Sequence, residues 1–343
     1  MKNERKSNIE LLRIILMFMI LALHANVLSL DFPSVKECIE YPLQSFMRYF
    51  NEYLCLGAVN TYVLISGWFG INYKTKGLCN FLFQCLFFSI SIFTIFALLG
   101  EIELTRINIL SSLLLYENAY WFVWSYLILY IFSPVLNGFI QNTKKQTYEK
   151  VLIGLFLAQT VIYIFTRCGF YQAGYHPLSF IALYLLARYF RIYGQIPNKY
   201  IAISGYFACA LINTLLNFLP IYIQHRPTSF TGILFSYTNP LNIAGPLFLL
   251  FFFVQLEIKN RVINQVAVSC FAVYLFHCHF CILEHYKSLC LTIFNKYGGI
   301  LYLVYIVLFM CLTFVIAIII DKVRIITFNH IWQFVEKRKN VTR

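Results

Sequence analysis

Long apolar stretches recur along most of this sequence, and each is close to the length that a helix needs to cross a bilayer. About 20 apolar residues in a helix span the hydrocarbon core. We therefore predict an all-α polytopic membrane protein with about ten transmembrane helices, at residues 8–30, 50–71, 78–99, 119–140, 149–166, 177–193, 199–219, 231–256, 266–286 and 299–321. Charged residues make up only 12% of the chain, which excludes an ordinary soluble domain.

The lysines and arginines between these stretches predict the orientation of the chain. Of the 27 Lys and Arg residues, 19 fall on the side of the N-terminus, 7 fall on the other side, and Arg13 lies within the first span. Short loops rich in Lys and Arg stay on the cytoplasmic side. We therefore expect both termini in the cytoplasm, and we read the net charge of +13 as this asymmetry rather than as a nucleic-acid site.

The first apolar segment carries three ionisable residues, Glu10, Arg13 and His24. A helix turns 100° and rises 1.5 Å per residue, so Arg13 and His24 share one face, about 16 Å apart along the axis. Ionisable groups at membrane depth are costly and usually mark a functional site. The alternative is a structural ion pair between Glu10 and Arg13, with a histidine that forms hydrogen bonds inside the bundle.

This segment resembles the first helix of the acyltransferase 3 family of bacterial membrane O-acyltransferases. That family has an Arg-x10-His signature, usually preceded by Asp-x-x-Arg. Arg13 and His24 match the signature, and Glu10 stands where Asp is commoner. Three later stretches are also similar to family motifs, and they contain Ser66 with Gly67, then Trp121, Tyr126 and Tyr130, and finally Tyr274 with His277.

The resemblance implies a multi-pass enzyme of the bacterial cytoplasmic membrane. Its transferase domain would cover residues 1–322 and leave 323–343 as a short basic cytoplasmic tail. Such enzymes move an acyl group, commonly acetyl, from cytoplasmic acyl-CoA to a hydroxyl of a cell-surface polysaccharide or lipid-linked glycan. Acyl-CoA would be a co-substrate, no cofactor would be bound permanently, and the partners would be the glycan and membrane lipids, without nucleic acid.

The expected roles follow from residue chemistry and from the resemblance. A guanidinium suits phosphate recognition, so Arg13 would hold the phosphates of CoA. His24 would act as general base or as nucleophile, and Glu10 is the second candidate catalytic residue. Ser66 and Gly67 would line the donor channel, or instead form a close contact between helices.

The aromatic and histidine candidates also have two interpretations. Trp121, Tyr126 and Tyr130 would contact the acceptor, or belong to the core or the interfacial belt. Tyr274 and His277 would line the acceptor channel, or His277 would be a core histidine with its hydrogen bonds satisfied. On one continuous helix, the histidines at 277 and 285 and Cys281 would share a face that suits zinc; we expect no metal there.

A multi-pass transporter or flippase of lipid-linked glycan is the alternative function. The apolar spans and the polar face of the first helix suit a transporter. Transporters are typically built from two repeated halves with paired interrupted helices. The sequence shows no such repeat, although Asn239-Pro240 and Gly245-Pro246 interrupt one span.

Overall fold

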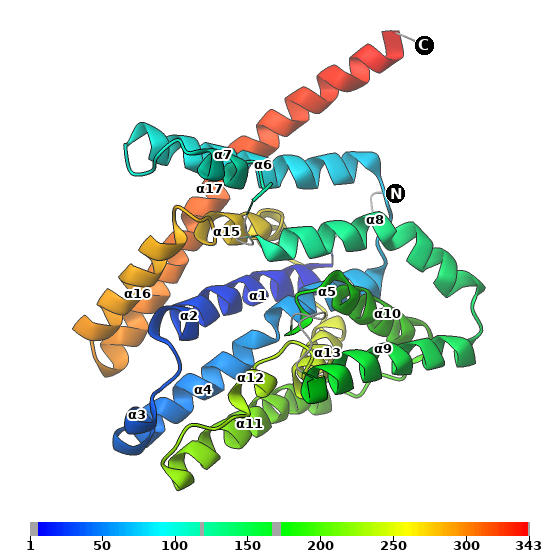
Figure 1. Cartoon of the computed structure of the whole chain (residues 1–343). Coiled ribbons are helices and arrows are strands. Elements are labelled where there is room, and N and C mark those ends of the chain that lie inside the picture. Colours follow the sequence, from blue (N-terminus) through cyan, green and yellow to red (C-terminus); the bar gives the residue numbers. More distant parts are fainter. Residues whose placement is uncertain (1–5, 117–119, 167–172, 342–343) are drawn as a thin grey trace. The chain divides into compact units, whose positions relative to one another are not determined.

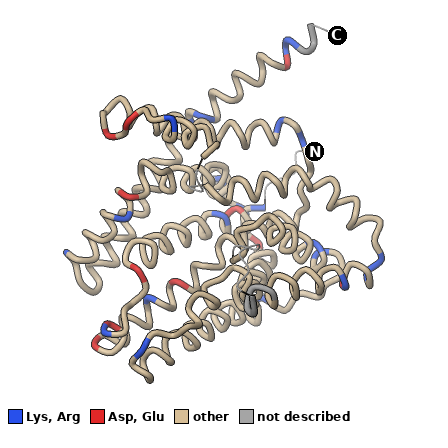
Figure 2. Tube along the Cα trace, viewed as in Figure 1, with Lys and Arg blue, Asp and Glu red and all other residues tan. Residues whose placement is uncertain are grey.

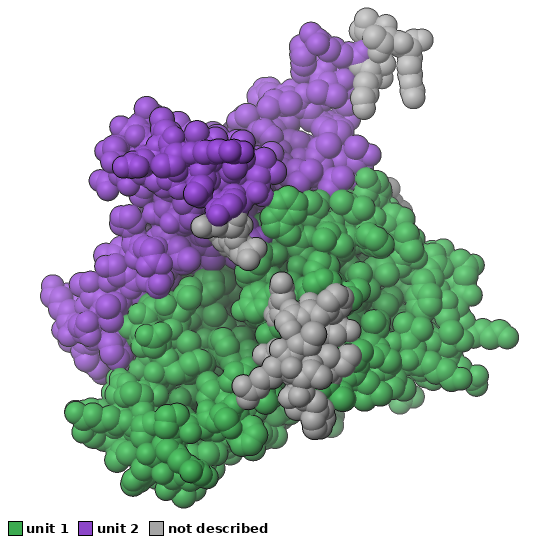
Figure 3. Space-filling view, in the orientation of Figure 1, with its two compact units in different colours: residues 1–73, 121–264 green, residues 74–120, 265–343 purple. Residues whose placement is uncertain are grey.

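The computed structural model describes residues 6–116, 120–166 and 173–341 of the chain (Figure 1). Its regular elements are all helices, and these ranges contain no strand, so the predicted all-α class is confirmed. The chain forms two compact units (Figure 3). Residues 1–73 and 121–264 belong to the first unit, and residues 74–120 and 265–343 belong to the second.

Five helical segments within the described ranges are long and apolar enough to cross a membrane. They are Ser7–Leu30, Thr75–Leu98, Trp121–Asn142, Lys199–Gln224 and Gly299–Arg338. Charged residues are sparse along the whole trace (Figure 2). The membrane character of the chain follows from these segments, while ten spans and two cytoplasmic termini stay predictions.

The first unit contains eleven helices in its described residues. They are α1 (Ser7–Ala25), α2 (Val27–Leu30), α3 (Val35–Glu40), α4 (Pro42–Leu56), α5 (Ala58–Phe69), α8 (Trp121–Asn142), α9 (Lys145–Thr166), α10 (Pro177–Tyr193), α11 (Lys199–Gln224), α12 (Thr231–Leu234) and α13 (Pro240–Val254). Helix α1 packs against α4 and α5, α5 packs against α10, and α11 packs along α13.

Two of the predicted spans in this unit are interrupted. The span 50–71 is divided at Gly57, between α4 and α5. A β-carbon at Gly57 would lie 2.8 Å from Cγ of Pro246 in α13, so the absence of a side chain lets the helices approach closely. The span 231–256 is divided before α13, which starts at Pro240 with Asn239 as its N-cap.

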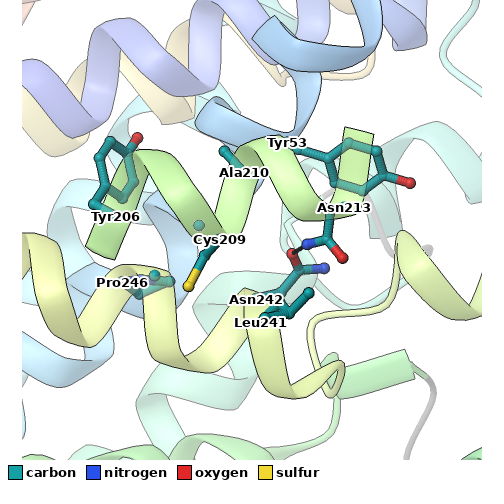
Figure 4. A pocket seen from close by; sticks show the side chains of 10 residues that line it. Tyr53, Tyr206, Cys209, Ala210, Asn213, Leu241, Asn242 and Pro246 are labelled. Carbon is teal, nitrogen blue, oxygen red and sulfur yellow. Dashed lines mark hydrogen bonds between the residues drawn. The ribbon is translucent and has the colours of Figure 1, made fainter. Parts of the chain in front are cut away.

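Buried asparagines connect α11 with α13 (Figure 4). Asn213 Nδ2 donates to Asn242 Oδ1 at 2.7 Å, and Asn60 Nδ2 donates to the Asn242 carbonyl at 2.7 Å. The cavity beside them has a volume of about 10 Å³, close to that of one water molecule. This cluster stabilises the interrupted segment, because it satisfies backbone groups that a continuous helix would have paired.

The second unit contains α6 (Thr75–Leu98), α7 (Arg106–Ser112), α15 (Cys270–His277), α16 (Leu283–Lys296) and α17 (Gly299–Val341), and α14 (Arg261–Ala267) crosses the boundary between the units. A buried ion pair joins Arg324 and Asp321 at 2.7 Å, and Gln84 of α6 donates to the same carboxylate at 2.9 Å. Helix α17 continues through most of the predicted tail, so that segment is helical.

The predicted span 266–286 is not one helix. It comprises α14, α15, a turn after His277 and the start of α16. His277, Cys281 and His285 therefore do not share one helical face, and that premise of the zinc interpretation is wrong. His279, which is fully buried in the turn, lies 3.0 Å from the Ser89 carbonyl and also accepts a hydrogen bond from the Cys281 amide.

Candidate active site

Glu10, Arg13 and His24, which form the predicted polar face, all lie on α1. Glu10 is buried, and its Oε1 lies 2.8 Å from Nη1 of Arg13, whose side chain stays 35% exposed. His24 lies in the last turn of α1 and is partly buried. Its carbonyl accepts a hydrogen bond from Ser29 Oγ at 2.6 Å. Ten residues of continuous helix lie between Arg13 and His24, so the step of eleven residues gives the expected rise of about 16 Å.

Side chains from α5 and α8 meet beside Arg13. The Tyr62 hydroxyl donates to the Arg13 carbonyl at 2.5 Å, and Ser66 Oγ donates to the Tyr62 carbonyl at 3.2 Å. Ser66 Oγ also lies 3.2 Å from the Tyr126 hydroxyl. The structure thus groups Arg13, Ser66 and Tyr126 from three different helices, and Tyr62 links them.

Gly67 has a different environment from Ser66. It is buried where α5 crosses α10, and a β-carbon there would overlap the Tyr184 carbonyl oxygen and lie 2.9 Å from the Tyr184 Cα. Close backbone approach is the usual reason for a small residue between membrane helices. The contact between α5 and α10 therefore accounts for this glycine.

Trp121 and Tyr130 pack against other aromatic rings. The Trp121 ring lies 4.2 Å from the ring of Tyr175 and 5.9 Å from that of Tyr237, between centroids. The Tyr130 ring lies 5.5 Å from the ring of Tyr73. Trp121 packs against a buried cluster, which supports the core interpretation for it. Tyr130 is partly buried and packs against the exposed Tyr73, so its ring lies near the surface.

Tyr274 and His277 belong to the second unit and lie on α15. The Tyr274 ring stacks on Phe271 at 5.8 Å. His277 is fully buried, with Nδ1 at 2.6 Å from the Val273 carbonyl and Nε2 at 3.3 Å from Cys278 Sγ. Val273 of α15 and Cys278, the residue that follows α15, thus provide hydrogen-bonding partners for this histidine, which agrees with the core interpretation.

Sequence reasoning missed Glu52, a fully buried carboxylate on α4. Its Oε2 accepts a hydrogen bond at 2.8 Å from Asn26, the residue that caps α1 two positions after His24. Arg48 Nε donates to Asn26 Oδ1 at 3.2 Å. An acidic residue inside an apolar span was the signal that could have found it.

The model of the acyltransferase domain family Acyl_transf_3 matches residues 6–322 of the chain, which is most of its length. The chain belongs to the acyltransferase 3 family. Together with the five apolar segments, this makes it a membrane acyltransferase. Comparison of this acyltransferase with curated proteins and with solved structures gave no match. The family membership favours group transfer over the transporter alternative.

Proposed function

We propose that this acyltransferase moves an acyl group, most commonly acetyl, from cytoplasmic acyl-CoA to a hydroxyl of a cell-surface polysaccharide or lipid-linked glycan, in the cytoplasmic membrane of a bacterium. One observation carries the proposal: a partly exposed guanidinium and a partly buried imidazole lie on one face of α1, about 16 Å apart. A thioester arm is similar in reach to this separation.

His24 is the general base of the proposed reaction. Neutral imidazole removes the proton from the acceptor hydroxyl while the hydroxyl oxygen attacks the thioester carbonyl carbon. The new C–O bond replaces the C–S bond, and the departing thiolate of CoA takes the proton back from the imidazolium. The alternative, a transient acyl-imidazole, uses the same nitrogen as nucleophile.

Arg13 binds the donor along its path to His24. Glu10 holds the guanidinium at one edge, which orients its remaining donors. Ser66 and Tyr126 form a pair of hydroxyl groups, and Tyr62 links Ser66 to the Arg13 carbonyl. A thioester arm that passes Arg13 therefore finds hydrogen-bonding partners on α1, α5 and α8, and we assign donor binding to these three residues.

Acyl transfer by the purified full-length protein tests the proposal. Acyl-CoA labelled in its acyl group is supplied with the isolated glycan, and label in the glycan is measured. We expect label in the glycan and a stoichiometric release of CoA. Arg13→Ala should raise KM for acyl-CoA more than it lowers kcat, because it removes a binding contact. No transfer of label from acyl-CoA would contradict the donor assignment.

A further inference from the structure

A cavity of about 90 Å³ lies at the start of α1, in the first unit. Its lining includes Lys6, Asn8, Trp68, Phe69, Arg191 and Val254. Asn8 Nδ2 donates to the Phe253 carbonyl at 2.8 Å, which ties the start of α1 to the end of α13. The segments that meet here are the start of α1 and the ends of α5, α10 and α13, and the sequence predicts all four for the cytoplasmic side.

Two cations border this cavity, and each lies over an aromatic ring. Lys6 Nζ lies 5.8 Å from the ring centre of Phe69, and Arg191 Cζ lies 5.2 Å from that of Trp68. Neither cation forms an ion pair with an Asp or Glu among residues 6–116, 120–166 and 173–341. Two positive charges without a carboxylate partner in this part of the chain attract an anion into the space beside them.

The end of α5 offers another explanation for these cations, because carbonyls at a helix C-terminus attract positive charge. Arg188 already has that role: its Nη1 donates to the Trp68 carbonyl at 3.4 Å, and its guanidinium packs against Gly70. Lys6 and Arg191 make no such hydrogen bond in the described residues. Within the described part of the chain, the charges of Lys6 and Arg191 are therefore available to bind a ligand.

Arg13 is a poorer partner for a phosphate than these two cations. Glu10 lies 2.8 Å from its guanidinium, so a phosphate at Arg13 also meets a buried carboxylate. Opposite charges attract and like charges repel most strongly where water is scarce. Lys6 precedes Arg13 by seven residues, about 10 Å farther from His24 along α1. The nucleotide end of a CoA donor would lie at that distance when its thioester reaches His24.

We propose that Lys6 and Arg191 bind phosphate groups of the acyl donor in this cavity, and that Arg13 contacts the donor deeper in the membrane. This inference rests on the proposed use of acyl-CoA. The volume suits a small polyatomic anion rather than a whole nucleotide. A phospholipid headgroup presents the same phosphate chemistry, so the experiment must separate the two sources.

The test compares two donors with the full-length protein in nanodiscs of phosphatidylcholine. Acetyl-CoA carries the nucleotide phosphates, and S-acetylpantetheine lacks them. For Lys6→Met and for Arg191→Met we expect KM for acetyl-CoA to rise about tenfold or more, with similar kcat. KM for S-acetylpantetheine should not change. Arg191→Lys should recover part of the affinity. Arg13→Ala should raise KM for both donors.

Lys145→Met is the matched control. Lys145 Nζ lies 5.8 Å from the ring centre of Tyr193, as Lys6 Nζ does from Phe69, but Lys145 does not line the cavity. Its KM values should equal those of wild type. The inference is overturned if wild type uses acetyl-CoA while the variants at Lys6 and Arg191 leave the ratio of the two KM values unchanged.

Phosphatidylglycerol added to the nanodiscs tests the lipid source. Native mass spectrometry shows whether wild type and the two variants retain this lipid. The cavity binds a headgroup, and the inference is wrong, if wild type retains the lipid, both variants lose it and the ratio of their two KM values equals that of wild type. If wild type transfers nothing from acetyl-CoA, the proposed function fails together with the inference. Failure of the proposed function and failure of the inference about Lys6 and Arg191 thus give different results.

Discussion

Glu52 shows how a single buried residue can position the helix that carries His24. Its carboxylate accepts a hydrogen bond from Asn26, and Asn26 Nδ2 also donates to the Arg48 carbonyl at 2.9 Å. These contacts hold the end of α1, whose last turn carries His24. In the proposed mechanism His24 is the general base, and Asn26, Arg48 and Glu52 would fix the helix end that carries it.

Replacement of Glu52 should therefore destabilise the protein. We expect Glu52→Ala to cost about 1–3 kcal/mol, because Asn26 loses a buried acceptor. Glu52→Gln should cost less, since its amide oxygen still accepts that hydrogen bond. Thermal unfolding in detergent measures both. Glu40→Ala, at an exposed residue 3.7 Å from Lys36, is the control and should change stability little. Equal effects of Glu52→Ala and Glu40→Ala would contradict this role.

At the scale of elements, the separation between α5 and α10 decides where Ser66 lies. Gly67 lets the α5 backbone approach Tyr184 of α10, and the neighbouring Ser66 then faces Tyr126 of α8. A larger residue at position 67 would push the helices apart. The hydrogen bond between Ser66 and Tyr126 would lengthen as a result.

Gly67→Ala should accordingly lower stability by about 1–3 kcal/mol, which is the usual cost of overpacking. We also expect reduced acyl transfer, because the hydroxyl groups beside Arg13 shift. Gly154→Ala on α9 is the matched control, since a β-carbon there has no neighbour within 4 Å. Alanine favours a helix over glycine, so this control should be neutral or slightly stabilising. A Gly67→Ala protein as stable as the Gly154→Ala protein would refute the close contact.

At the scale of the whole molecule, the distribution of Lys and Arg predicts the topology. A fluorescent protein that folds only in the cytoplasm should fluoresce when it is fused after Lys144 or after Arg343. Alkaline phosphatase, which is active only outside the cytoplasm, should be active when it is fused after Glu103. The reverse pattern at any of the three positions would show that the ten-span arrangement is wrong.

The sequence predicts the parts of this molecule that depend on local composition. Apolar length gave the all-α class, and helical periodicity placed Arg13 and His24 on one face of α1. The helix interruptions at Gly57 and after His277 were not predicted, because each lies inside a stretch that is long enough to form one continuous span. Tertiary partners decide them: Pro246 packs on Gly57, and His279 meets the Ser89 carbonyl.

The sequence predicted the residue types of the candidate site but not the contacts between them. Ser66 and Tyr126 were named from motifs, but their contact depends on how α5 meets α8. Tyr62 was not singled out, since nothing local distinguishes it from 24 other tyrosines. Its hydroxyl reaches the Arg13 carbonyl only through the packing of α5 on α1. The sequence thus predicts which residue types form the site, but it does not predict the contacts between helices.

Acyl transfer by a His24→Ala protein tests whether His24 is the general base of the reaction. The purified variant and wild type are given labelled acyl-CoA and glycan, and label in the glycan is counted. His330→Ala, at an exposed histidine of α17, is the control. We expect the rate of transfer to fall about 100-fold or more for His24→Ala, with donor binding retained and the control unchanged. Transfer at the wild-type rate by the His24→Ala protein would contradict it.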